Sequence, residues 1–333
     1  RPARGLVTRP GLEEVCDYRA HVDQAVAGLL ERGALDGGTL AVLELGLHHE
    51  QQHQELIVTD FKHLLSHNPT FPAYRADCVE TAVEPTPRLG WLGVEGGTHE
   101  IGHADPGFRF DNESPRHEVL LQDFELASRL TTNGEYLEFM SEGGYERPEW
   151  WLSDGWATVE EQRWRAPAYW VRRDGAWYAH TLGGLRRLRE DEPVTHLSAY
   201  AADAFARWAG ARLPTEFEWE SVAQGMPMKG NFVENERFHP TPAASGEPAD
   251  GPRQLFGDTW EWTQSAYAPY PGYEPPAGAL GEYNGKFMSN QMVLRGGSCA
   301  TAHDHIRHTY RNFFPPNARW QFSGIRLARD DAS

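Results

Sequence analysis

The chain has 333 residues, and 31 Lys and Arg stand against 48 Asp and Glu, for a formal net charge of −17. Such an acidic surface repels nucleic-acid phosphates and anionic lipid, so neither is expected as a partner. Cys16, Cys78 and Cys299 are scattered and form no CxxC pair, which argues against a disulfide scaffold and for a reducing compartment. No apolar run is long enough to span a bilayer and no signal-peptide core precedes residue 10, so we expect a soluble, cytoplasmic protein.

The first part of the chain is predicted to be helical. Residues 1–10 are rich in Arg, Pro and Gly and are interpreted as an extended arm. Apolar residues then recur at helical spacing over residues 11–33, and after a Gly-Gly break a second helix is predicted to run to about Leu65. The second helix carries an apolar stripe of Leu45, Leu56, Phe61, Leu64 and Leu65. Two helices are an incomplete bundle. We therefore expect residues 1–68 to be a helical domain that either is unusually small or lacks its N-terminal part in this chain.

The second helix also carries a pair of histidines, His49 and His53. Their spacing of four places both rings on one helical face, where two neutral imidazoles can share a transition metal. Such pairs often arise by chance, but this one lies in an unbroken polar run, His48 to Gln54, and burying that run without a ligand would leave unpaired donors. The run also satisfies HExxH, with Glu50 after His49, so a zinc metallopeptidase is an alternative.

The character of the sequence changes after a Pro-containing linker at residues 69–89. From residue 90 to 333, short alternating segments are separated by Gly, Pro, Asn and Asp clusters. Two helices are predicted, Asn133–Ser141 and Ala199–Ala209, whereas long segments such as 143–195 show little regular pattern. The predicted fold class is therefore α+β, with a partial helical bundle followed by a domain rich in irregular structure.

Four strings in the second domain are jointly distinctive. They are DNESPRH (residues 111–117), RLPTEFEWE (212–220), GDTWEW (257–262) and RGGS (295–298). In this order they resemble the formylglycine-generating-enzyme fold, a C-type-lectin-like scaffold. Joined to an upstream DinB-like helical domain bearing HxxxH, the chain resembles the ergothioneine-biosynthesis sulfoxide synthases, with the selenoneine synthases and ovothiol-type enzymes as close relatives. The resemblance implies a mononuclear non-haem iron enzyme that uses O2 to join a sulfur or selenium donor to the imidazole of hercynine, the Nα-trimethylated betaine of histidine.

The same resemblance implies roles for individual residues. Fe(II) would be bound by His49, His53 and a third His expected upstream of residue 1. Gln52 would hydrogen-bond the hercynine imidazole, while Asn312 and Phe313 would border its betaine end. Because a quaternary ammonium neither accepts nor donates hydrogen bonds, an aromatic face is what can hold it, at roughly 0.5–2 kcal/mol per contact. Plain core packing is the alternative for Phe313.

The donor pocket departs from the family pattern. Members that use γ-glutamylcysteine carry Asp and Arg where this chain has Phe314 and Ala318. Neither side chain pairs with an ammonium or a carboxylate, so we expect a donor other than γ-glutamylcysteine, either cysteine or a selenosugar. For the catalytic Tyr of the family, Tyr270 and Tyr273 are candidates, with ordinary loop packing as the alternative.

Three further interpretations remain open. Asp258 and Glu261 are candidates for a structural Ca²⁺ site, as in some relatives with this fold, with hydrogen bonds that pin the loop as the alternative. Cys299 lacks the partner Cys of the copper site in formylglycine-generating enzymes, which argues against formylglycine chemistry. A non-catalytic, lectin-like binding module is the alternative to an enzyme.

Overall fold

A computed structural model gives the fold. It describes residues 9–33, 35–76, 86–245, 251–278, 281 and 284–330. The residue contacts divide the chain into two compact units, Arg1–His49 and Glu50–Ser333. Most of the predicted arm and part of the predicted linker, including Cys78, lie outside the described residues. In the ranges given above, no helix is both long and apolar enough to cross a membrane.

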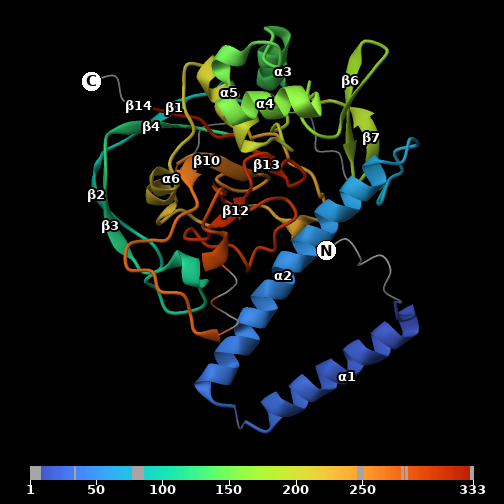
Figure 1. Ribbon diagram of the computed structural model, residues 1–333, viewed down its shortest axis with the longest axis vertical. Coiled ribbons are helices and arrows are strands. Elements are labelled where there is room, and N and C mark those ends of the chain that lie inside the picture. Colours follow the sequence, from blue (N-terminus) through green and yellow to red (C-terminus); the bar gives the residue numbers. More distant parts are fainter. Residues whose placement is uncertain are drawn as a thin grey trace. The chain divides into compact units, whose positions relative to one another are not determined.

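The two predicted N-terminal helices form as α1 (Leu12–Glu31) and α2 (Gly37–Ser66) (Figure 1). α1 contains no buried residue, and its Tyr18 is 70% exposed. α2 is one continuous helix, but its residues from Glu50 onward belong to the second compact unit. The contacts therefore divide the chain within α2, whereas the sequence analysis placed the boundary after residue 68.

The second unit contains short strands that pair into small sheets. The strands are β1 (Trp91–Val94), β2 (Gly97–Ile101), β3 (His117–Leu121), β4 (Phe124–Ala127), β5 (Trp170–Arg173), β6 (Ala176–Thr181), β7 (Gly184–Arg187), β8 (Gly230–Asn231), β9 (Phe256–Gly257), β10 (Trp260–Ala266), β11 (Met292–Arg295), β12 (Asn312–Phe314), β13 (Ser323–Gly324) and β14 (Ala328–Asp330). The sheets have the strand orders β1-β4-β14, β12-β11-β10-β13, β2-β3, β5-β6-β7 and β8-β9. Pairing is antiparallel except for β10 with β13 and β8 with β9.

Among the described residues, these strands are accompanied by the α-helices α3 (Asn133–Ser141), α4 (Ser153–Gln162), α5 (Ala199–Trp208) and α6 (Glu216–Ala223). The predicted α3 and α5 are confirmed, and the Ser198 hydroxyl accepts from the Ala201 amide to cap α5. The expectation of little regular structure over residues 143–195 was wrong. α4 buries only Gly155 and Val159, so it carries almost no apolar period by which a sequence could reveal it.

The core of the second unit lies around β10, at the centre of that unit in Figure 1. Trp260 and Trp262 on β10 and Trp219 on α6 are buried, and α5 and α6 both contact β10. The RGGS string ends β11 in a tight turn: Gly296 has φ +96°, and a Cβ there would lie 2.6 Å from the Leu255 carbonyl oxygen, which only glycine avoids. The α+β class with much irregular structure is confirmed.

Candidate functional site

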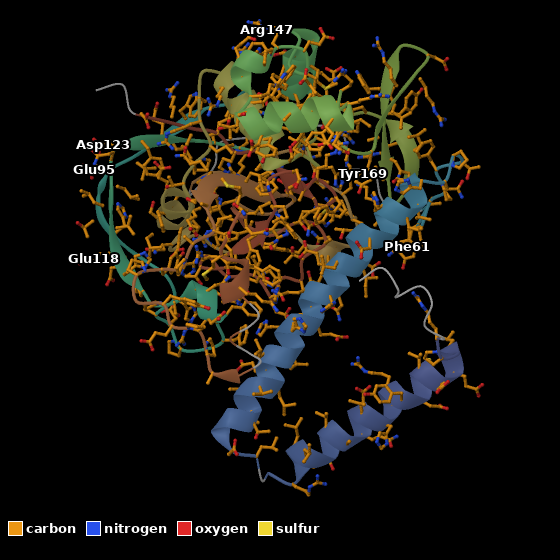
Figure 2. All side chains as sticks on the ribbon, in the orientation of Figure 1. Phe61, Glu95, Glu118, Asp123, Arg147 and Tyr169 are labelled. Atoms are coloured by element: carbon orange, nitrogen blue, oxygen red, sulfur yellow. The ribbon has the colours of Figure 1, made fainter. Side chains whose placement is uncertain are left out.

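The buried face of α2 in the second unit is polar. Glu55, Thr59 and Lys62 are its buried residues, 6%, 0% and 1% exposed, and their spacing puts them on one helical face. The predicted apolar stripe is only partly covered: Phe61 (labelled in Figure 2) is 37% exposed and Leu64 64%, whereas Leu45, Leu56 and Leu65 are half-buried. An apolar stripe usually marks the contact face, but here polar side chains are the buried ones. Glu55 and Lys62 have partners elsewhere in the second unit, and the Thr59 hydroxyl donates to the Leu56 carbonyl of its own helix.

Glu55 is held by neutral donors. Its Oε1 accepts from Trp260 Nε1 at 2.7 Å and from Ser298 Oγ at 2.8 Å, and its Oε2 accepts from Thr301 Oγ1 at 2.9 Å. Burial raises the pKa of the Glu55 carboxyl, against the effect of these hydrogen bonds. The carboxyl thus ties α2 to β10 and to the turn after β11, which sets the rotation of this part of α2 about its axis.

Gln52, one helical turn before Glu55, makes a second polar contact between α2 and the rest of the second unit. Its Nε2 donates to the Tyr310 hydroxyl at 2.6 Å, and that hydroxyl lies 3.1 Å from Nε2 of His305. Tyr310 and His305 are 4% and 1% exposed. Burial raises the pKa of Tyr310 well above its ordinary value, so the hydroxyl keeps its proton throughout the neutral range.

Gln52 and Tyr310 line a cavity of about 130 Å³. Its walls carry the aromatic residues Phe110, Trp260, Phe313 and Phe314, and the amides of Asn112, Asn284, Asn312 and Gln321. Arg311 also reaches the wall, but its Nε and Nη2 donate to the Glu216 carboxylate at 2.7 and 2.9 Å. The cavity therefore presents aromatic faces, neutral amides and the Glu55 carboxyl, whose oxygens accept from Trp260, Ser298 and Thr301. Its guanidinium already has a counter-ion. Such walls suit a ligand with a cationic or apolar end and several hydrogen-bonding groups.

The structure brings most of the predicted substrate and donor residues to this cavity. Asn312, Phe313 and Phe314 form β12, and all three line it together with Gln52. The Phe313 ring stacks on Tyr267 with centroids 4.0 Å apart and planes 9° from parallel, so its face is held rigidly. Ala318 is 3% exposed and is not part of the lining.

The candidate catalytic tyrosines lie outside the cavity lining. Tyr273 donates to Asp111 Oδ2 at 2.8 Å. Tyr270 is 3% exposed, with the Arg311 guanidinium 4.0 Å from its ring centroid. These contacts fit the packing alternative, and the tyrosine that reaches the cavity is Tyr310.

Sequence reasoning missed Tyr310, Glu55 and Trp260 as cavity residues. A partial signal existed for Glu55, which follows Gln52 by three positions and therefore shares its helical face. Trp260 was noticed only as part of the GDTWEW string. Tyr310 stands two positions before Asn312, and no pattern in the sequence connects it with α2.

The predicted histidine pair is on α2, where His49 is half-buried and His53 exposed. Across the described residues, no three His, Cys, Asp or Glu side chains are grouped so as to hold a metal ion. Two neutral imidazoles are a ligand type that Fe(II) takes. The two side chains therefore have the ligand chemistry that an iron site needs, and such a site would require at least one further ligand.

The expected calcium ligands have other partners. Arg326 donates to both oxygens of Glu261, with Nη2 2.8 Å from Oε1 and Nε 2.9 Å from Oε2. Asp258 accepts from the Asn231 side chain at 2.9 Å and from the Thr241 amide at 2.8 Å. Because a guanidinium already neutralises Glu261, the two acids do not form a joint cation site, and the loop-pinning alternative fits these contacts.

Lys62 is the second ionisable group on the buried face of α2. Its Nζ lies 2.5 Å from His196 Nε2, and the rings of Tyr169 and Phe322 have centroids 5.1 and 4.6 Å from it. Burial lowers the pKa of Lys62 to about 7. Burial, and then the neighbouring Lys62, also lower the pKa of His196 well below its ordinary value. No carboxylate forms an ion pair with Lys62 in the part of the chain that the structure describes.

Comparisons with known proteins agree with the motifs. A family model described as the sulfatase-modifying factor enzyme 1-like domain matches residues 79–248 and 232–331. The chain is 33% identical over 340 residues to the hercynine oxygenase of Mycolicibacterium thermoresistibile, covering 94% of this chain and 74% of that protein. It is 35% identical over 314 residues to the hercynine oxygenase of Mycolicibacterium smegmatis, covering 86% and 71%. It is 26% identical over 288 residues to the formylglycine-generating enzyme of Bos taurus, covering 74% and 76%. The chain therefore belongs to the family that its motifs resemble, the hercynine oxygenases of the ergothioneine-biosynthesis type, built on a sulfatase-modifying factor enzyme 1-like domain.

Proposed function

We propose that this protein is a non-haem Fe(II)- and O2-dependent oxygenase that forms a C–S or C–Se bond on the imidazole of hercynine. One observation carries the proposal: Gln52, Asn312 and Phe313, which the family resemblance assigns to hercynine, line a single cavity although they come from opposite ends of the second unit's sequence. Relatives named hercynine oxygenases at 33% and 35% identity support it.

The cavity walls suit the two ends of hercynine. The trimethylammonium group needs an aromatic face rather than a hydrogen-bond partner, and Phe313, stacked on Tyr267, offers a rigid one. The imidazole ring needs a hydrogen-bond partner in the plane of the ring, and the amide of Gln52 is of that kind. Asn312 on the same strand supplies an amide for the carboxylate end.

His49 and His53 would hold the iron, with a further ligand completing the site. Neutral imidazoles suit Fe(II), and the chemistry that the metal would supply is the activation of O2 for reaction with the thiol or selenol donor. We expect His49→Ala and His53→Ala each to abolish stoichiometric iron binding by elemental analysis and to abolish turnover. Activity retained in both variants would refute the iron assignment, and bound zinc with chelator-sensitive peptidase activity would favour a metallopeptidase instead.

The donor is proposed to be cysteine or a selenosugar rather than γ-glutamylcysteine. Phe314, at the position where γ-glutamylcysteine users carry Asp, lines the cavity and cannot pair with an ammonium. The guanidinium of Arg311 is already paired with Glu216, so it does not replace a missing partner for the donor carboxylates. A selenosugar carries no charged termini, so it would need no such partners in the cavity.

The direct test supplies hercynine, Fe(II) and O2 to the intact protein with cysteine, γ-glutamylcysteine or a selenosugar in turn, and identifies products by mass. Sulfoxide or selenoneine formation with one of the two predicted donors is the expected result. Phe314→Asp should shift the relative rate toward γ-glutamylcysteine. Phe314 is the better position for this variant, because Ala318 is buried and an Arg there would overpack it. No product with any donor, and no binding of hercynine, would refute the proposed function.

A further inference from the structure

The contacts behind Gln52 form a short relay of hydrogen bonds. The Gln52 amide nitrogen lies 2.6 Å from the Tyr310 hydroxyl, which lies 3.1 Å from His305 Nε2. The Tyr310 ring is fixed by edge contacts with Phe110, at 5.6 Å and 83°, and by a tilted contact with Trp260 at 5.5 Å. The hydroxyl therefore has little freedom to move away from either neighbour.

In the structure the amide nitrogen of Gln52, rather than its oxygen, faces the Tyr310 hydroxyl. A tyrosine hydroxyl has one proton to donate, whereas an amide NH₂ brings its own. The opposite amide orientation would need Tyr310 to donate to the Gln52 oxygen and His305 Nε2 to carry a proton. In the orientation that the structure has, Gln52 Nε2 donates to Tyr310, and the Tyr310 proton can be donated to His305 Nε2. This arrangement requires His305 to be neutral with its proton on Nδ1. The Gln52 nitrogen then faces Tyr310, and its oxygen faces away from it.

We propose that Tyr310, backed by His305, is a positioning residue that selects the acceptor end of the Gln52 amide for the substrate. The site would then favour a ligand that donates a ring N–H, as a neutral imidazole does, over one that can only accept. This role rests on the proposed function, because hercynine is the imidazole in question. A glutamine without this support rotates between two amide orientations, and only one of them matches the ligand.

The test measures hercynine affinity by calorimetry on the intact wild-type protein and on Tyr310→Phe, which removes the hydroxyl and keeps the ring. We expect the dissociation constant to rise about tenfold, the effect of one lost hydrogen bond of about 1.4 kcal/mol. Tyr145→Phe is the matched control: Tyr145 is also 4% exposed, and its hydroxyl lies 2.8 Å from that of Tyr136, away from the cavity lining. It should leave the dissociation constant unchanged.

A double-mutant cycle with Gln52→Ala separates positioning from general damage. If Tyr310 acts through Gln52, Tyr310→Phe should have no further effect on affinity once Gln52 is removed. An unchanged affinity in Tyr310→Phe, or an equal loss with and without Gln52, would overturn the positioning role while leaving the proposed function intact. If the wild-type protein itself does not bind hercynine, both fail. His305→Phe, which keeps a planar ring, should also raise the dissociation constant for hercynine. This second variant tests the proposal if Tyr310→Phe does not fold.

Discussion

Two groups of buried ionisable residues in the second unit are held in different ways. Inside the β-rich part, carboxylates meet guanidinium groups: Glu261 pairs with Arg326 at 2.8 Å and Glu220 with Arg295 at 2.5 Å. On the face of α2, Glu55 is held by three neutral donors, and Lys62 by an imidazole. A buried charge is costly unless it is paired. The Glu261 and Glu220 carboxylates are therefore paired with cations, although Asp258 in the same part of the unit is held by neutral donors. By contrast, both buried ionisable groups of α2 lack an oppositely charged partner among the described residues, so burial decides their charge.

This difference bears on the proposed activity. The stretch of α2 from Glu50 to Ser66 carries Gln52 and His53, and it is attached to the second unit by Glu55 and Lys62. The arginine pairs should thus govern the stability of the whole unit. The α2 contacts should govern the placement of this helix, and they should be the more sensitive to pH.

The largest effect is expected from breaking a core pair. Arg326→Ala would leave Glu261 buried without its cation and remove the donors to three backbone carbonyls. We expect the free energy of unfolding to fall by about 3–5 kcal/mol, as for other buried pairs that lose one partner, in chemical denaturation at pH 7. A loss below about 1 kcal/mol would contradict the contrast between the two groups.

A somewhat smaller loss is expected from Glu55→Ala, which leaves the Trp260, Ser298 and Thr301 donors without an acceptor. One to three kcal/mol is typical for a buried polar group left unsatisfied, and we expect about 2–3 kcal/mol here. The loss should be local, so amide hydrogen exchange should speed up in residues 50–66 while exchange in α5 stays near the wild-type rate. Uniform acceleration throughout the second unit would argue against a separate α2 attachment.

Replacing Lys62 should raise the free energy of unfolding rather than lower it. Its pKa falls from 10.5 to about 7 on folding, so between pH 10.5 and 7 only the unfolded chain binds the proton. Stability should therefore drop as the pH falls through this window, and the lysine should add no further change below pH 7. Lys62→Met should raise the free energy of unfolding at pH 7 by about 1–2 kcal/mol and flatten its dependence on pH between 7 and 10.5. A slope equal to that of the wild-type protein would show that Lys62 is not its source.

The smallest effect is expected for an exposed ion pair. Arg207 and Asp203 lie 2.8 Å apart on α5, with side chains 48% and 22% exposed. Arg207→Ala should change the free energy of unfolding by about 0–1 kcal/mol, measured beside Arg326→Ala under the same conditions. A change comparable to that of Arg326→Ala would mean that burial does not distinguish the two pairs.

Much of this molecule follows from local sequence. The helical periods of α1 and α2, the Ser198 cap of α5 and the four ordered strings are sufficient to predict the fold class and the family. The family resemblance also assigns Asn312, Phe313 and Phe314 to substrate and donor binding, and the structure brings all three to one cavity. These features depend on residues close together in the chain, so they can be recognised there.

The tertiary structure alone decided which face of α2 is buried and which tyrosine reaches the cavity. Hydrophobic periodicity detects a helical face that is buried because it is apolar. It does not detect a polar face that is buried because residues distant in sequence form hydrogen bonds with it. Glu55 meets Trp260 across 205 positions, and Gln52 meets Tyr310 across 258. These polar side chains are buried because hydrogen-bond partners lie next to them, and the positions of those partners depend on the fold of the whole second unit.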